Sequence, residues 1–470
     1  MCRFLSLLFL LFPCLVHAQS PNRFALDSLA NKARIYLNTR QPDSLYALMG
    51  EAFQRQIPAD QFRTISAGLS AQLGIWQRNT FRAFKGSAIR YKATFANAPM
   101  DFYLSQDSTG HIQTFLFRNY EPDPPTTLPT IVNTNPLRTP LDRRVDSLTR
   151  AFFAQNKAIG LSVGLLRNDS LFVFGYGETA KSNKTPPTAD NLFEIGSISK
   201  TFTTTLLADL VQRGKLNLTD PVNRYLPDSI PALQKDGRPI TLLTLSNHTS
   251  GLPRLPGNLN LIANPINPYK SYGRATLFAF LKQVELATPP SQTLAYSNLG
   301  VGLLGTILEI KTRQSYETML QELITRPLGM TRTVLTISDK EKSLFVQGHD
   351  SERNPASSWE FQSLAGAGAI RSTVNDLIIY LKAQLGAAPK SLGKAMQLTH
   401  QTTFSEKGRQ IGLGWFSDEQ GWFYHNGGTG GFTSFAGFSR QNKMALVVLS
   451  NASVRVDALS QQLIELIGKQ

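Results

Sequence analysis

The sequence has only two cysteines, Cys2 and Cys14, and both lie in its first eighteen residues. That stretch, MCRFLSLLFLLFPCLVHA, has an early cation, a short apolar run and an ending suited to signal peptidase. The run is too short to span a membrane. We therefore predict an export signal over residues 1–18, cleaved before Gln19, and a secreted or periplasmic protein whose mature chain has neither a disulfide nor a thiol nucleophile.

Signals for metal and nucleic acid binding are also missing. The histidines are dispersed, with no H-E-x-x-H motif and no cysteine ligands beside them, so neither a metal site nor a cofactor is expected. The formal net charge is +15, but the lysines and arginines are scattered, without a basic helix. This distribution is typical of a solvated cationic surface, and we expect no nucleic acid partner and no transmembrane segment after signal cleavage.

Length and composition favour a globular protein with two or more domains, because 470 residues with 41% hydrophobic and 17% charged side chains can form well-buried cores. Residues 20–75 show helical spacing, and the period changes to two from Trp76, as in IRYKATFA. Helices followed by a curled antiparallel sheet predict a small α+β accessory domain over residues 19–120. The Pro-rich stretch 121–140 predicts an extended linker.

Residues 141–470 predict a second, larger α+β domain. A helix over RRVDSLTRAFF precedes two strands in IGLSVGLLRNDSLFVFGYG, and the far end offers the buried strand MALVVLSN and a closing helix. An antiparallel sheet assembled from both ends of this domain would carry its terminal helices on one face. The middle, from Thr201 to about Gly386, is mainly helical with long loops.

The stretch FEIGSISKTF places a serine and a lysine three residues apart at the start of an apolar helix. Gly196 permits a tight entry, Ser197 is expected in the first turn, and residues three apart share a helical face. A buried lysine can lose its proton and act as a base toward Ser197, because desolvation disfavours its charged form. The motif alone decides nothing, since a second S-x-x-K occurs by chance frequency at Ser391 and Lys394.

Two later motifs strengthen the signal. LAYSNLG places Tyr296 and Asn298 two positions apart at the start of another apolar helix, and WFYHNGGTGG leads from a strand into His425, Gly427 and Gly428. The glycines allow a substrate to lie against the backbone. The order S-x-x-K, Y-x-N, H-x-G within one domain predicts a single cleft.

These motifs resemble those of the serine β-lactamase and penicillin-binding-protein superfamily, on the branch of class C β-lactamases and D,D-carboxypeptidases. The resemblance spans roughly residues 141–468 and includes LLTLSNHTSGLP, ITRPLGMTRT and GAGAIRSTVNDLIIYLKA. It implies a β-lactamase/transpeptidase-like fold, in which an antiparallel sheet flanked by helices is joined to a helical subdomain. The front domain is similar to a small uncharacterised α+β domain found before such hydrolases.

Carried over to this sequence, the resemblance implies roles for the motif residues. Ser197 would accept the acyl group, Lys200 and Tyr296 would share proton transfer, and the oxyanion would lie between the backbone N–H groups of Ser197 and Gly428. The substrate-binding positions would be Asn298, which would hold the substrate amide, together with His425, Gly427 and Gly428.

His425 stands where K-T-G enzymes have lysine. A histidine is mostly neutral at pH 7, so the change weakens the case for an efficient β-lactamase. His248 is expected to be a structural loop residue, because no G-x-S-x-G motif accompanies it. We expect an exported serine acyl hydrolase acting on D-alanyl peptides, related amides or β-lactams. An esterase of small carboxylic esters and a non-catalytic protein that binds peptidoglycan fragments are the alternatives.

Overall fold

The computed structural model describes residues 23–120, 128–167, 169–260 and 264–468. The predicted signal peptide, both cysteines and the first part of the predicted linker lie outside these residues. The chain divides into two compact units at residues 123 and 124, and each unit is described here by itself. Among the described helices, none combines the length and the apolar character needed to cross a bilayer.

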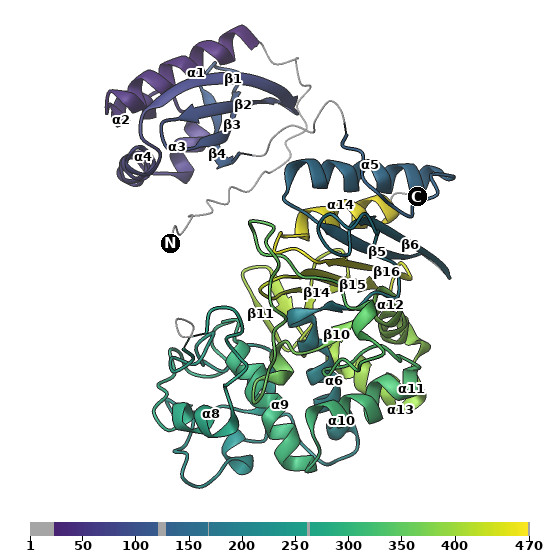
Figure 1. Ribbon diagram of the computed structural model, residues 1–470. Coiled ribbons are helices and arrows are strands. Elements are labelled where there is room, and N and C mark those ends of the chain that lie inside the picture. The colour runs from purple at the N-terminus through teal and green to yellow at the C-terminus, as the bar shows by residue number, and fades with distance from the viewer. Residues whose placement is uncertain (1–22, 121–127, 168, 261–263, 469–470) are drawn as a thin grey trace. The chain divides into compact units, whose positions relative to one another are not determined.

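The first unit packs four helices against a four-stranded antiparallel sheet with strands in sequence order (Figure 1). The strand β2 alternates buried and half-buried positions along its length, so one face of the sheet enters the core. Trp76 lies in this core with no exposed surface, stacked on Phe95. The elements are α1 (Arg23–Asn38), α2 (Pro42–Tyr46), α3 (Glu51–Gln56), α4 (Ala59–Leu73), β1 (Trp76–Lys85), β2 (Ala88–Phe95), β3 (Pro99–Gln106) and β4 (Ile112–Asn119).

The second unit is built on an eight-stranded sheet in the order β11-β12-β13-β14-β15-β16-β5-β6. Each strand is antiparallel to its neighbours, and the pairing of β16 with β5 joins the two ends of the unit, as the sequence predicts. The strands are β5 (Gly160–Arg167), β6 (Ser170–Gly177), β11 (Phe404–Glu406), β12 (Arg409–Ile411), β13 (Phe416–Ser417), β14 (Trp422–Gly428), β15 (Thr433–Ser439) and β16 (Met444–Ser450).

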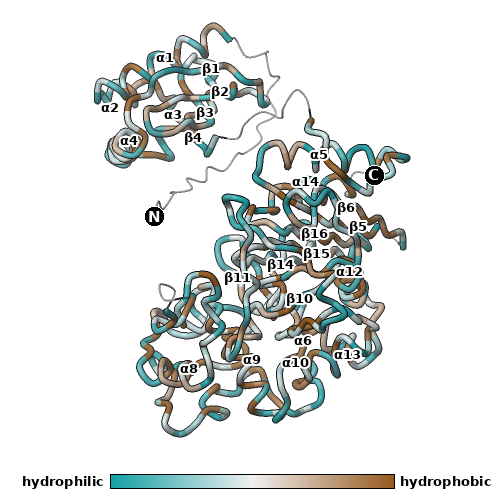
Figure 2. Tube along the Cα trace, in the orientation of Figure 1, coloured by the Kyte–Doolittle hydropathy of each residue, from teal (hydrophilic) through white to brown (hydrophobic). Residues whose placement is uncertain are grey.

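Helices cover both faces of this sheet. Side chains alternate along a strand, so Leu161, Val163 and Leu165 of β5 pack toward α5 (Pro140–Gln155) and α14 (Asp457–Gly468) on one face. The opposite face packs on the helical part of the unit. Figure 2 shows hydrophobic residues in both the strands and the helices of this unit. The other helices of this unit are α6 (Ser199–Gln212), α7 (Leu242–Ser246), α8 (Arg274–Leu281), α9 (Asn298–Thr312), α10 (Tyr316–Leu320), α11 (Arg326–Leu328), α12 (Val374–Lys382) and α13 (Lys390–Thr399).

Part of the segment expected to be a linker belongs to the second unit and is hydrogen-bonded to β6 within it. The N–H of Thr134 donates to Gly175 O at 2.9 Å, and the N–H of Gly177 donates to Val132 O at 2.8 Å. This stretch therefore continues the sheet beyond β6, its edge strand in the described residues.

Candidate active site

Ser197 lies between the sheet and the helical region. The short strand β7 (Phe193–Glu194) pairs with β10 (Arg371–Ser372) and leads into a 3₁₀ turn, Gly196–Ile198, that carries Ser197. The turn runs directly into α6, which begins at Ser199. Ser197 therefore lies just before the α-helix and not in its first turn, because Gly196 bends the chain with a φ of 49°.

Lys200 lies in the first turn of α6 and has no exposed surface. Its Nζ is 2.9 Å from Ser197 Oγ, 2.9 Å from Asn298 Oδ1 and 2.7 Å from Ala367 O. Burial, helped by the nearby cation Arg254, holds the pKa of Lys200 well below its ordinary value. A neutral amine has two N–H groups and one lone pair. The two N–H groups match the Asn298 and Ala367 oxygens, which leaves the lone pair for the Ser197 proton.

Tyr296 brings a phenol to the same point. It precedes α9, whose first residue is Asn298, and Ser197 is near enough to its hydroxyl to lower the pKa of the phenol. Lys200 Nζ lies 4.9 Å from the centre of the Tyr296 ring. Burial raises the pKa of Tyr296 to about 12, against the lowering effects of Ser197 and Arg254. The phenol therefore keeps its proton at neutral pH, and the amine is the better base.

The strand end at Gly427 and Gly428 packs against the turn that carries Ser197. A Cβ added to Gly196 would lie 2.6 Å from Gly428 N, and one added to Gly427 would lie 2.1 Å from Ile195 O. Both distances are shorter than a real Cβ tolerates, so the approach of the two backbones requires glycine at these positions. The arrangement brings the backbone of Gly428 next to the turn of Ser197.

His425 lies on β14 and is 1% exposed. Its Nδ1 is 2.6 Å from Asn426 O, so Nδ1 carries the hydrogen and Nε2 has a free lone pair. Nε2 has no hydrogen-bond partner among the described residues. Burial and the charge of Lys200 lower the pKa of His425 to about 3. His425 is therefore neutral at physiological pH and supplies no positive charge to a ligand.

The part of the chain that forms this site is similar to known proteins. The sequence profile of the family described as Beta-lactamase matches residues 145–468. The chain belongs to the Beta-lactamase family. It is 32% identical over 274 residues to a β-lactamase of Pseudomonas fluorescens, covering 58% of this chain and 73% of that protein.

Two further relatives widen the comparison. The D-alanyl-D-alanine-carboxypeptidase/endopeptidase AmpH of Escherichia coli K12 is 28% identical over 329 residues, covering 66% of this chain and 83% of that protein. A solved structure of a β-lactamase/D-alanine carboxypeptidase from Pseudomonas syringae superposes with a TM-score of 0.63 at 24% identity, covering 71% of this chain and 99% of that one. The predicted α+β, β-lactamase/transpeptidase-like fold is confirmed, and this member of the Beta-lactamase family is a serine hydrolase.

In this β-lactamase-family protein, His248 packs beside Tyr296, which the sequence did not predict. Its ring centre is 4.3 Å from that of Tyr296, its Nδ1 accepts the Ser297 N–H at 3.2 Å, and its φ is 62°. Burial, followed by the charges of Lys200 and its neighbours, holds the pKa of His248 well below its ordinary value. His248 is thus an uncharged side chain that packs against Tyr296 at the site.

Arg254, unlike His248, was not singled out by the sequence. Its Cζ lies 4.9 Å from the centre of the Tyr296 ring, and its side chain is exposed. Both His248 and Arg254 belong to SNHTSGLPRLPG, the start of which was quoted for its family resemblance. The motif could therefore be recognised in the sequence, but its packing against Tyr296 could not be predicted.

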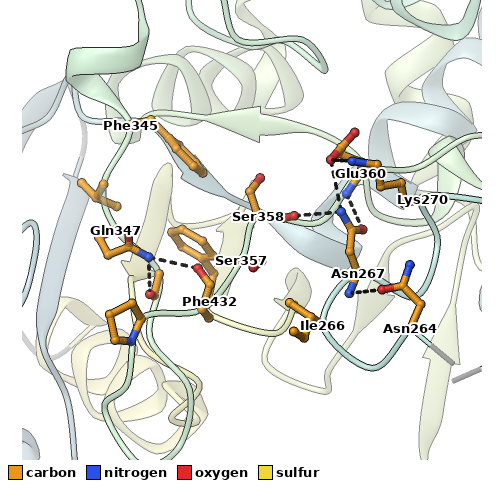
Figure 3. A pocket seen from close by; sticks show the side chains of 14 residues that line it. Asn264, Ile266, Asn267, Lys270, Phe345, Gln347, Ser357, Ser358, Glu360 and Phe432 are labelled. Carbon is orange, nitrogen blue, oxygen red and sulfur yellow. Dashed lines mark hydrogen bonds and ion pairs between the residues drawn. The ribbon is translucent and has the colours of Figure 1, made fainter. Parts of the chain in front are cut away.

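A cavity of about 820 Å³ lies between the segment 264–270 and the loop 345–360, and none of Ser197, Lys200 and Tyr296 lines it (Figure 3). Lys270 and Glu360 form an ion pair of 3.0 Å on one side, and Phe345 and Phe432 line another part. Tyr269, between the lining residues Asn267 and Lys270, is 3.5 Å through its hydroxyl from Asn298 Nδ2.

The strand before Ser197 also braces this cavity. Glu194 Oε1 accepts hydrogen bonds from Ser358 Oγ and from the backbone N–H of Trp359, both at 2.7 Å. Glu194 is buried and lies 3.6 Å from the Arg371 guanidinium. The wall of the cavity is thus tied to the backbone three residues before Ser197.

The duplicate motifs lie apart from this cluster. Ser391 and Lys394 are exposed on α13. Asn38, the partner of Tyr36 in the stray Y-x-N, is hydrogen-bonded to the backbone of Trp76 within the first unit. No group of three or more histidine, cysteine, aspartate or glutamate side chains with metal-binding geometry occurs in the described ranges.

Proposed function

We propose that this protein is an exported serine hydrolase that forms an acyl-enzyme on Ser197, with D-alanyl peptides or related amides and β-lactams as its substrates. The supporting observation is the contact between Ser197 Oγ and the fully buried Lys200 amine. A lysine whose pKa is lowered by burial loses its proton more readily than a free lysine, and its amine lies within hydrogen-bond reach of the nucleophile.

Acylation begins with transfer of the Ser197 proton to the Lys200 amine. Ser197 Oγ then forms a bond to the substrate carbonyl carbon, and the oxyanion accepts hydrogen bonds from the backbone N–H groups of Ser197 and Gly428. When the C–N bond breaks, the leaving nitrogen takes a proton from the Tyr296 hydroxyl. Lys200 returns its proton to Tyr296, and both groups are again neutral.

Deacylation repeats these steps with water as the nucleophile. Lys200, acting with Tyr296, removes a proton from the attacking water, a second tetrahedral intermediate forms, and Ser197 Oγ leaves with the proton restored. Asn298 orients Lys200 through its Oδ1 and presents its Nδ2 toward the side of the site that Tyr269 occupies. The net reaction consumes one water and needs no cofactor.

The substrate class rests on the family and on the named relatives, one of which is called a D-alanyl-D-alanine-carboxypeptidase/endopeptidase and another a β-lactamase. Both names describe enzymes that hydrolyse an amide bond. A peptide ending in D-alanyl-D-alanine is therefore the first substrate to test.

A small-ester esterase is the second candidate, and His425 favours it. A lysine at this position gives a permanent cation for a substrate carboxylate, whereas the buried His425 is neutral. An ester without a carboxylate needs no such anchor. A non-catalytic protein that binds peptidoglycan fragments is the third candidate.

Intact-protein mass spectrometry tests the proposed function directly. Exposure to a penicillin or a fluorophosphonate is expected to add one adduct to the unmodified protein and none to Ser197→Ala. Parallel assays with an aryl ester, a D-Ala-D-Ala peptide and a chromogenic cephalosporin then separate the candidates. A protein that forms no adduct and hydrolyses none of the three, yet binds muropeptides, would instead be the non-catalytic binder.

We further propose that residues 1–18 direct export, that residues 19–120 form an accessory domain and that residues 121–140 connect it to the hydrolase domain. N-terminal sequencing of protein from the culture medium or the periplasm is expected to begin at Gln19. Recovery of a chain that still begins at Met1 from the cytoplasm contradicts the export proposal.

A further inference from the structure

We infer that Arg254 is the cation that binds the carboxylate of an anionic substrate on the leaving-group side of the site. It would take the role that a lysine at the position of His425 has in K-T-G enzymes. This inference rests on the proposed function and names the charge of its substrate. It follows from the position of Arg254, the way its backbone is held and the charges that surround it.

The backbone of Arg254 is fixed on the segment that carries Tyr296. The carbonyl of Arg254 accepts the N–H groups of Asn298 at 2.9 Å and Leu299 at 3.2 Å. The Ser297 hydroxyl donates to Pro253 O at 2.7 Å, and the N–H of Ala295 donates to His248 O at 2.8 Å. These hydrogen bonds fix the backbone of Arg254, while its side chain is exposed.

The guanidinium is also held in place by the Tyr296 ring, 4.9 Å from Cζ. A cation over an aromatic face loses part of its rotational freedom before a ligand arrives, so less entropy is lost on binding. In the part of the chain that the structure describes, no aspartate or glutamate forms an ion pair with Arg254. Its planar fork of N–H donors therefore remains available for a carboxylate.

The charges around the site favour an anion. Two cations, Arg254 and Lys200, are among the groups that shift the pKa values of the site residues. Among the described residues, no carboxylate contributes to the pKa shifts of Lys200, His248, Tyr296 or His425. His425 and His248 are neutral through burial, and Lys200 works as a neutral base. Arg254 is the exposed permanent cation in this set.

The geometry of the reaction places a carboxylate near Arg254. Tyr296 gives its proton to the leaving nitrogen, and in a D-alanyl-D-alanine peptide the terminal carboxylate is one carbon away from that nitrogen. The carboxylate must therefore lie close to Tyr296, on whose ring Arg254 rests. A leaving group without a negative charge gains nothing from this contact.

Binding to the Ser197→Ala protein tests the inference without catalysis. Calorimetry compares an acylated D-Ala-D-Ala peptide, as the free acid, with the same peptide carrying a C-terminal amide. We expect the free acid to bind about tenfold or more tightly than the amide, the range of a charge-assisted hydrogen bond. The preference is expected to weaken as salt is raised.

Arg254→Gln added to Ser197→Ala is expected to remove the preference and to leave affinity for the amide within about threefold. Arg254→Lys is expected to keep part of the preference, because it keeps the charge and loses the planar fork. Arg326→Gln, which removes an exposed arginine of α11, is the matched control and should change neither affinity. Affinity for the amide reports that the variants remain folded.

The inference is overturned if the free acid binds no more tightly than the amide, if neither peptide binds, or if Arg254→Gln keeps the preference. Equal loss of both affinities in Arg254→Gln also overturns it, because it assigns Arg254 to the support of Tyr296. Acylation of Ser197 in the unmodified protein is measured separately. A protein that reacts with a fluorophosphonate but shows no carboxylate preference contradicts this inference alone.

Discussion

Lys200 Nζ lies 2.9 Å from Ser197 Oγ, at the end of a side chain that has no exposed surface. The contact joins the burial of the amine to its ability to accept a proton. A buried amine is costly in its charged form, and the neutral form that burial favours is the one that can accept the serine proton.

Removing either partner is expected to lower turnover strongly. Ser197→Ala should lower kcat/KM for the best of the three test substrates by at least about 10³-fold, and Lys200→Met by about 10²- to 10⁴-fold. The second S-x-x-K pair gives the matched controls, since Ser391→Ala and Lys394→Met change exposed residues of α13 and should leave kcat/KM unchanged. Equal losses in the two pairs would remove the basis for the assignment.

Lys200→Met also tests the lowered pKa through stability. Between the folded-state pKa of Lys200 and its ordinary value of 10.5, the unfolded chain binds a proton that the folded chain does not. The free energy of unfolding of the wild type therefore rises with pH in this window, by at most about 1.4 kcal/mol per pH unit from this group.

The variant lacks this titration, so the difference in unfolding free energy between wild type and Lys200→Met should shift in favour of the wild type as pH rises toward 10.5. Denaturant unfolding at several pH values measures it. Lys394→Met, which removes an exposed lysine, should show no such trend. A difference that stays constant with pH means that Lys200 keeps an ordinary pKa.

Tyr296→Phe removes the hydroxyl that we propose protonates the leaving group and keeps the ring on which Arg254 lies. We expect kcat to fall by about 10²-fold while the fluorophosphonate adduct still forms on Ser197, because Lys200 remains. Tyr36→Phe, in the Y-x-N of the first unit, is the matched control. An unchanged kcat in Tyr296→Phe would assign all proton transfer to Lys200.

Gly196→Ala should damage both stability and activity. The added Cβ would lie 2.6 Å from Gly428 N, and the residue keeps a φ of 49°. Steric overlap in a packed site costs about 1–3 kcal/mol, in addition to the left-handed backbone. Gly214→Ala separates the two effects, since Gly214 has a φ of 67° but open space around it.

Thermal unfolding and kcat/KM of both glycine variants make the comparison. Gly214→Ala should lose about 1 kcal/mol and keep its activity. If the two variants behave alike, the close approach of the turn to β14 is not required for the reaction.

The order and spacing of S-x-x-K, Y-x-N and H-x-G were readable from the sequence, because each motif lies at the end of a regular element whose periodicity is local. The same holds for the strands at the two ends of the second unit, β5 and β16, which pair as expected. The 3₁₀ turn at Ser197 was missed, since a helix pattern does not show how its first turn is wound.

What the sequence by itself determined is the set of candidate reactive groups and the elements that carry them, since helical and strand periods depend on neighbours a few residues away. Only the tertiary structure decided the electrostatics: that Lys200 is fully buried, that His425 is neutral and that Arg254 rests on Tyr296. Burial and charge contact depend on segments distant along the chain packing together, and a pKa follows from that packing and not from residue type.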